Sequence, residues 1–146
     1  MKKALSLLVL LLVFSQPSCT TLTTNFHVVE EGRFYRSAQL SEKELSKKIE
    51  EYGIKTVVNL RGERPGAAWY EAEKKLCEQL GVKFVNITFS SKPSRQCIEE
   101  LLSVFDSAQY PIYVHCQGGR DRAGLASVIY LVDRGKPVSE AFAHLT

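Results

Sequence analysis

The chain has 146 residues, of which 45% are hydrophobic, a size and composition that suit one domain with one core and give little support to a second domain. Its formal net charge is +3, and removing Lys2 and Lys3 together with an N-terminal leader leaves about +1. So mild a charge argues against the class of nucleic-acid-binding proteins with a strongly basic surface, and we expect no nucleic acid partner.

The first residues have the pattern of an export signal. Two lysines follow Met1, and the residues from Ala4 to Phe14 are apolar except for Ser6. This run has the length of the hydrophobic region of a signal peptide and is too short to span a membrane. We therefore predict that residues 1–18 are a signal peptide or lipoprotein leader, rather than an uncleaved anchor, and that the protein is exported.

Cys19 stands where a bacterial lipoprotein carries its lipidated cysteine. It follows a small residue, but Gln16 and Pro17 replace the apolar and small residues that this motif prefers. Lipidation with membrane attachment and simple cleavage nearby both stay open, so a membrane-anchored lipoprotein and a periplasmic protein are alternatives. Residues 19–25 would form a tether, and residues 26–146 the folded domain.

Runs of strand length alternate along the rest of the chain with stretches of helical period. The predicted strands cover residues 26–29, 33–36, 54–60, 82–87 and 111–114, of which the first two form an edge hairpin. The predicted helices cover residues 41–52, 65–80, 94–105, 125–132 and 137–145. This alternation is typical of an α/β fold whose mostly parallel central sheet is flanked by helices on both faces. Right-handed crossovers place the loops 61–66, 88–94 and 116–122 on one rim of the sheet.

The helix 65–80 carries one apolar stripe. Trp69, Ala72, Leu76 and Leu80 recur at helical spacing, so we expect them to pack in the core. Trp69 is accordingly expected to be a core residue rather than part of a binding site.

A charged turn, residues 61–66, follows the strand 54–60. Ligands of open α/β sheets bind at the carboxyl ends of strands, so Arg61 and Arg64 are candidates to line an anion site. A solvent-exposed turn with local ion pairs is the alternative.

The stretch VHCQGGRDRAG, residues 114–124, joins the last predicted strand to the helix 125–132. A glycine-bearing loop between a strand and a helix turns its N–H groups into one cup at the helix N-terminus, which is an anion site. Cys116 lies at the mouth of that cup, where a thiol is readily converted to a thiolate. Arg122 adds a planar guanidinium that fits two phosphate oxygens. The pair predicts attack on a bound oxyanion, with phosphate the leading candidate.

His115-Cys116-x-x-Gly119-x-x-Arg122 resembles the H-C-x-x-G-x-x-R signature of the protein tyrosine phosphatase superfamily, especially its atypical dual-specificity branch. The segment FYRSAQ, residues 34–39, resembles an opening motif of bacterial and fungal members. The resemblance implies a two-step reaction in which Cys116 takes the phosphoryl group and water then releases it. No cofactor and no metal are implied.

The same resemblance assigns roles to the residues around the cysteine. Arg122 and the loop would bind the phosphate oxygens, through Gln117, Gly118, Gly119, Arg120, Asp121 and Arg122. We expect Gly119 to supply a positive φ, which a tight loop of this kind often needs. His115 is expected to support Cys116 through hydrogen bonds, or else to be a buried strand histidine without a role.

The general acid is the difficult assignment. Resembling phosphatases supply an aspartate from a mobile loop before the cysteine, but residues 86–95 contain no carboxylate. We therefore assign this role to Asp121, with Glu63, the substrate or water as alternatives. Pairing of Asp121 with a neighbouring arginine is the alternative without a catalytic role. Ala123 stands where the family commonly has Ser or Thr, whose hydroxyl helps the thiolate leave, so we expect slow turnover.

The predicted function is that of a cysteine-dependent phosphatase acting on phosphotyrosine, phosphoserine or phosphothreonine in proteins, or on a phosphorylated small molecule or lipid. A phosphate-binding pseudophosphatase and a rhodanese-like or arsenate-reductase-like thiol enzyme are the alternatives. Cys77 and Cys97 either pair as a disulfide or are small buried side chains. The last helix stops with the chain where resembling phosphatases continue, which is consistent with a truncated C-terminus. The oligomeric state is left open.

Overall fold

A five-stranded sheet in the order β1-β2-β5-β3-β4 forms the centre of the computed structural model, which describes residues 24–145. The strands are β1 (His27–Glu30), β2 (Phe34–Ser37), β3 (Thr56–Asn59), β4 (Lys83–Asn86) and β5 (Ile112–His115). Only the β1–β2 pair is antiparallel, and the three other pairs in this sheet are parallel. The mostly parallel sheet of the predicted α/β fold is therefore confirmed. β1 and β2 pair as the predicted hairpin at one edge of the sheet, with β1 outermost and β2 between β1 and β5.

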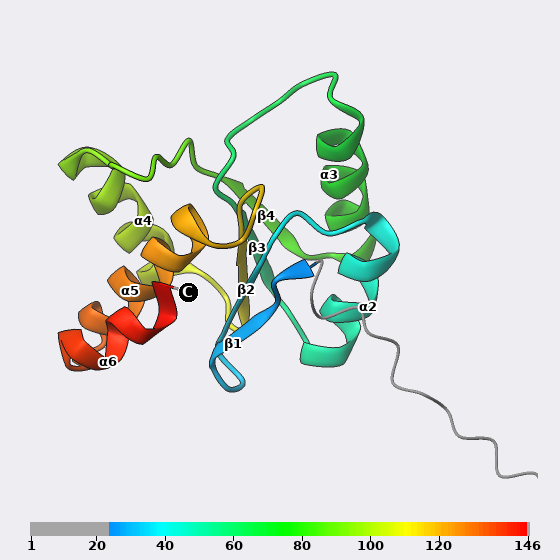
Figure 1. Ribbon diagram of the computed structural model, residues 1–146. Coiled ribbons are helices and arrows are strands. Elements are labelled where there is room, and N and C mark those ends of the chain that lie inside the picture. The colour runs from blue at the N-terminus through cyan, green and yellow to red at the C-terminus, as the bar shows by residue number, and fades with distance from the viewer. Residues whose placement is uncertain (1–23, 146) are drawn as a thin grey trace, which may run out of the picture.

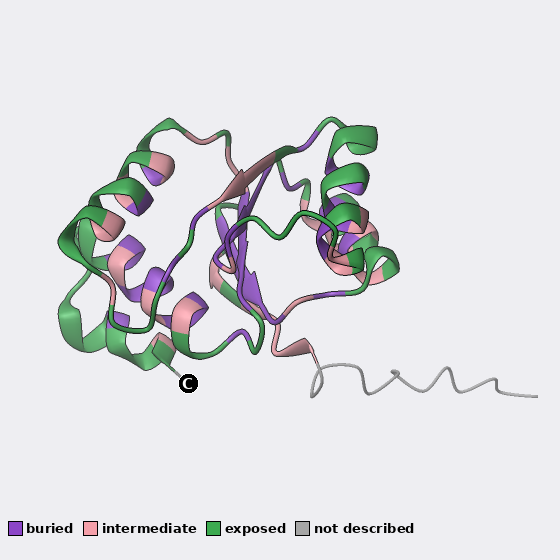
Figure 2. Cartoon of the chain, turned by 90° about the horizontal axis from the view of Figure 1, so that it is seen from above, coloured by how far each residue is buried: buried purple, intermediate pink, exposed green. Residues whose placement is uncertain are grey.

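Helices cover both faces of this sheet (Figures 1 and 2). The helical segments are α2 (Glu42–Tyr52), α3 (Ala68–Leu80), α4 (Arg95–Ser107), α5 (Asp121–Asp133), α6 (Val138–Phe142) and the short 3₁₀ turn η1 (Ala143–Leu145). α2 and α3 lie on one side, and α4, α5 and α6 on the other. A capping box begins α2, because the Ser41 hydroxyl accepts from the Glu44 N–H and the Glu44 carboxylate accepts from the Ser41 N–H.

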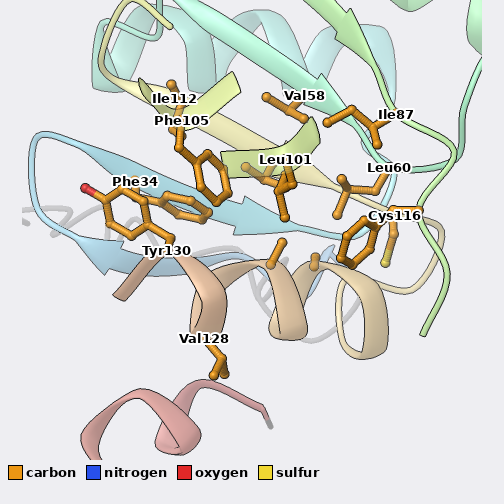
Figure 3. Close-up of a cluster of buried hydrophobic side chains, with 14 of the residues drawn as sticks. Phe34, Val58, Leu60, Ile87, Leu101, Phe105, Ile112, Cys116, Val128 and Tyr130 are labelled. Carbon is orange, nitrogen blue, oxygen red and sulfur yellow. The ribbon is translucent and has the colours of Figure 1, made fainter. Parts of the chain in front are cut away.

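The core forms two clusters, one on each face of the sheet, because successive strand residues point to opposite sides. Phe34, Val58 and Val114 contribute to the cluster under α4 and α5, and Figure 3 shows Cys116 at one end of it. Tyr35 and Val57, each next in sequence to a member of the first cluster, belong to the second cluster under α2 and α3. Both faces of the sheet are thus buried, as predicted for a mostly parallel sheet with helices on both sides.

Helix α3 departs from the prediction in its start and in its buried face. It begins at Ala68 rather than at Pro65, because Pro65 and the residue after it form a turn. Its buried residues are Tyr70, Glu73, Leu76 and Cys77. Leu80 is 46% exposed, and Trp69 is only half-buried, so the expectation that both lie in the core was wrong. The buried face of α3 therefore includes Glu73, a charged residue that hydrophobic periodicity assigns to solvent.

The remaining cysteines do not form a pair in the described part of the chain. Cys77 is buried on α3, Cys97 is half-buried on α4, and both are free thiols. Their helices lie on opposite faces of the sheet, which separates the two sulfur atoms. The predicted leader and Cys19 lie outside residues 24–145 and stay predictions. Within that range no helix combines the length and apolar character needed to cross a membrane.

Candidate active site

The loop that follows β5 holds Cys116 at the N-terminus of α5. β5 ends at His115, and α5 begins at Asp121. The Cys116 side chain is buried, and the Gly119 N–H donates to its Sγ at 3.2 Å. The sulfur atom of Cys116 therefore lies beside both an N–H donor and the N-terminus of α5.

Gly119 has the positive φ that the sequence predicted, at +70°. A Cβ built on it would lie 2.2 Å from the backbone nitrogen of Ala38 and 2.4 Å from the carbonyl carbon of Ser37. The chain leaving β2 therefore packs directly against the loop, and only glycine fits at this contact. Gly118, in contrast, has open space where a Cβ would be.

The segment 34–39 supports the loop from this side. Arg36 is fully buried, and its guanidinium donates from Nη1 to the Gly119 carbonyl and from Nη2 to the His144 carbonyl. The Gln39 N–H donates to the Gln117 carbonyl at 3.2 Å. Arg36 was missed as a functional residue, although an arginine within a short apolar strand was a signal of a buried, hydrogen-bonded guanidinium.

His115 is fully buried and faces a buried carboxylate rather than solvent. Oε1 of Glu73 lies 2.7 Å from His115 Nε2, and the Glu73 side chain is only 4% exposed. The contact joins an imidazole and a carboxylate without a well-directed hydrogen bond. The other Glu73 oxygen, Oε2, accepts from Gln39 Nε2 at 3.0 Å. The predicted contact of His115 with Cys116 is replaced by this contact with Glu73, which sequence reasoning missed.

A cavity of about 240 Å³ adjoins the loop. Its lining residues are Arg61, Arg64, Ala67, Trp69, Gln117 and Arg122. The Arg61 guanidinium lies 3.6 Å from the centre of the Trp69 ring, and its Nη1 donates to Gln39 Oε1 at 3.0 Å. Nη1 of Arg122 donates to the Leu60 carbonyl at 3.3 Å, which fixes that side chain at the same wall.

The lining is cationic. Burial and, after it, the positive charge of Arg122 lower the pKa of Arg61, which is the mark of cations held close together. Of the two alternatives for the turn 61–66, the structure has Arg61 and Arg64 at an anion-attracting cavity rather than in local ion pairs. Trp69 also belongs to this cavity, where it forms a flat support for a guanidinium.

The proposed acid lies at the rim. The Asp121 side chain is 74% exposed, and its Oδ1 is 3.6 Å from Nε of the equally exposed Arg120. Neither residue is among those that line the cavity, and within the described chain that lining contains no carboxylate. Ala123, one turn into α5, is fully buried. Residues 24–145 hold no cluster of three or more His, Cys, Asp or Glu side chains that could bind a metal ion.

Comparison with known proteins gives a family and a set of similar folds. The family model described as "DSP-PTPase phosphatase fused to NAD+ Kinase" matches residues 16–145. The comparison with curated proteins found no match. Among solved structures, the core catalytic domain of the PP-IP phosphatase SIW14 from S. cerevisiae has a TM-score of 0.69 and 20% identity, with 83% of this chain and 73% of that chain covered. TpbA from P. aeruginosa has a TM-score of 0.61 and 20% identity over 85% of this chain and 73% of that one. At these identities the likeness concerns the fold.

Proposed function

Because the chain belongs to the family of DSP-PTPase phosphatases fused to NAD+ kinase, and is thus a phosphoric monoester hydrolase, we propose that it works through a phosphocysteine intermediate on Cys116. The observation that carries this proposal is the loop between β5 and α5. There the Cys116 Sγ accepts a hydrogen bond from the Gly119 N–H, and Arg122 lines the adjoining cavity. A thiol held by an N–H donor, with a fixed cation in the cavity beside its loop, suits attack on a phosphoryl group.

The reaction has two displacements at phosphorus. In the first, Cys116 Sγ forms a bond to phosphorus, the bond to the leaving-group oxygen breaks, and that oxygen takes a proton. In the second, water attacks the phosphorus and loses a proton, the S–P bond breaks, and inorganic phosphate leaves the regenerated thiolate. Arg122 and the loop N–H groups stabilise the charge on the phosphoryl oxygens in both steps.

The proposed acid for the first displacement is Asp121. Its exposed position at the rim suits it to meet a leaving group that enters from solvent, after release from its contact with Arg120. Leaving groups that are stable as anions need this proton least. We therefore expect aryl phosphates to be turned over faster than alkyl phosphates.

For the substrate we propose a phosphorylated molecule with further negative charge near the scissile phosphate. Three arginines in the lining of one cavity support this class over a phosphate ester on a neutral alcohol. Phosphotyrosine in an acidic peptide, a phosphorylated lipid and a small phosphorylated metabolite all share this chemistry.

Turnover of para-nitrophenyl phosphate between pH 5 and 8 tests the proposed function. We expect release of para-nitrophenol by the wild-type chain and none by Cys116→Ser, with a burst of product if the second step is slow. A folded wild-type chain that releases no product but binds inorganic phosphate would instead be a phosphate-binding pseudophosphatase. Cys116-dependent turnover of thiosulfate or arsenate would favour a thiol enzyme of another class.

A further inference from the structure

Glu73 is a buried carboxylate whose two oxygens face different parts of the site. One oxygen lies 2.7 Å from Nε2 of His115, the residue that precedes Cys116 in sequence. The other oxygen accepts from Gln39 Nε2 at 3.0 Å. A carboxylate inside a core is costly unless both oxygens have partners. The inner face of α3 is otherwise formed by Tyr70, Leu76 and Cys77, so nothing in the packing alone asks for a charge at this position.

The chemistry of the partners fixes the orientation of Gln39. A carboxylate can only accept hydrogen bonds, and a guanidinium can only donate them. The Gln39 amide nitrogen therefore faces Glu73, and its carbonyl oxygen faces Arg61, whose Nη1 donates to it at 3.0 Å. The Gln39 main chain is held as well, because its N–H donates to the Gln117 carbonyl. Glu73 thus determines which end of Gln39 is offered to Arg61.

Arg61 ends this chain of contacts at the wall of the cavity. Its guanidinium is stacked on Trp69 and held in plane by Gln39, which is its one side-chain hydrogen-bond acceptor within the described residues. A guanidinium has five N–H donors in a rigid fork, so the others are available to a ligand. Arg61 and Arg122 line the same cavity, the second of them beside the nucleophile loop.

We propose that Glu73 is a positioning residue of the active site, and that it acts through Gln39 to align Arg61 as a second anion-binding guanidinium opposite Arg122. Its other oxygen holds His115 behind Cys116. The proposal rests on the phosphatase function given above, since it assigns Arg61 to the binding of the phosphate group on which a phosphatase acts. Arg64, which lines the same cavity with no hydrogen bond to Gln39 or Glu73 in the described residues, provides the matched control.

Binding of inorganic phosphate by the full chain tests the alignment without any turnover. We would measure the dissociation constant calorimetrically in a Cys116→Ser background, and add Gln39→Leu, Arg61→Leu and Arg64→Leu. Each of the three is expected to weaken binding, Arg61→Leu by about tenfold, the size expected for one charge-assisted hydrogen bond. In the Arg61→Leu chain, Gln39→Leu is expected to cause no further loss of phosphate affinity, because Gln39 acts through Arg61. In the Arg64→Leu chain it should weaken binding by its full factor.

Kinetic measurements separate the effects of the two contacts of Glu73, the one with Gln39 and the one with His115. With para-nitrophenyl phosphate, Gln39→Leu is expected to raise KM with kcat within about twofold, while Glu73→Leu lowers kcat as well because His115 loses its partner. Glu73→Gln, which can still accept from Gln39, should restore KM but not kcat. Equal effects of Gln39→Leu in the Arg61→Leu and Arg64→Leu chains would overturn the proposal, and so would unchanged phosphate binding in Gln39→Leu. If the wild-type chain shows no turnover, the proposed function fails, while the phosphate titrations, extended to Glu73→Leu in the same Cys116→Ser background, still decide whether Glu73 and Gln39 align Arg61.

Discussion

Replacement of Gly119 by alanine is expected to cost both stability and activity. The added Cβ would lie 2.2 Å from Ala38 N and 2.4 Å from Ser37 C, where ordinary contacts begin at about 3.4 Å. Both neighbours are backbone atoms at the end of β2, so no side chain can rotate away to relieve the overlap. The loop itself must move away from β2 by about 1 Å, and the Gly119 N–H moves with it.

Two terms set the size of the effect on stability. A φ of +70° costs an alanine about 1–2 kcal/mol, and overpacking against fixed atoms costs about 1–3 kcal/mol more. We expect the free energy of unfolding to fall by about 2–5 kcal/mol. The shift also removes the donor to Cys116 Sγ, and loss of one such N–H lowers kcat by about 100-fold or more.

Two other glycines separate these terms. Gly81 has a φ of +66° but open space around a Cβ, so Gly81→Ala measures the conformational cost alone, about 1–2 kcal/mol. Gly118 lies in the same loop with open space and no positive φ, so Gly118→Ala should change stability by no more than about 0.5 kcal/mol. Urea unfolding and para-nitrophenyl phosphate turnover provide both readouts. A Gly119→Ala chain that is no less stable than Gly81→Ala and keeps wild-type turnover would refute the packing of β2 against the loop.

Three further predictions concern titratable groups. Iodoacetate at pH 7.5 should modify Cys116 and spare Cys77 in the folded chain, because burial raises the pKa of Cys77 to about 12, and peptide mass spectrometry with and without phosphate checks this. The free energy of unfolding should fall as the pH rises above about 9. Burial raises the pKa of Tyr130, like that of Cys77, to about 12, so the unfolded chain releases the protons of these two groups at lower pH than the folded chain does. A free energy of unfolding in urea that stays constant from pH 8 to 11 would contradict this. Asp121→Asn should slow alkyl phosphates more than aryl phosphates, and equal losses in kcat would count against Asp121 as the acid.

The nucleophile loop could be predicted because its parts are close in sequence. Cys116 and Arg122 lie six positions apart between a strand and a helix, and the local chain direction brings them to one anion cup. The α/β fold followed from alternating periodicities in the same way. The capping box at Ser41 is also a local signal, confirmed by two hydrogen bonds between neighbours on one turn.

The residues that support the loop could not be predicted, because their contacts are distant in sequence. Arg36 lies 83 positions from Gly119, and Gln39 lies 34 positions from Glu73. Hydrophobic periodicity also misleads at α3, since it treats a charge as a solvent-facing residue. For this reason the predicted apolar stripe of α3 included Trp69, and the burial of Glu73 was not predicted. A charge whose partners come from other elements of the fold carries no local signal that identifies those partners.

The register of the sheet explains why the two motifs of this chain depend on each other. Ser37 pairs with His115 across the parallel β2 and β5, so the residues that follow each strand leave the sheet side by side. Two positions further on, the Gln39 N–H meets the Gln117 carbonyl. A slip by one residue would turn the β2 side chains to the opposite face. Arg36 would then point away from Gly119, and Gln39 would lose its place between Glu73 and Arg61. The cysteine signature therefore specifies the chemistry, while the second motif, through this register, specifies the shape of the loop and the charge at the cavity wall.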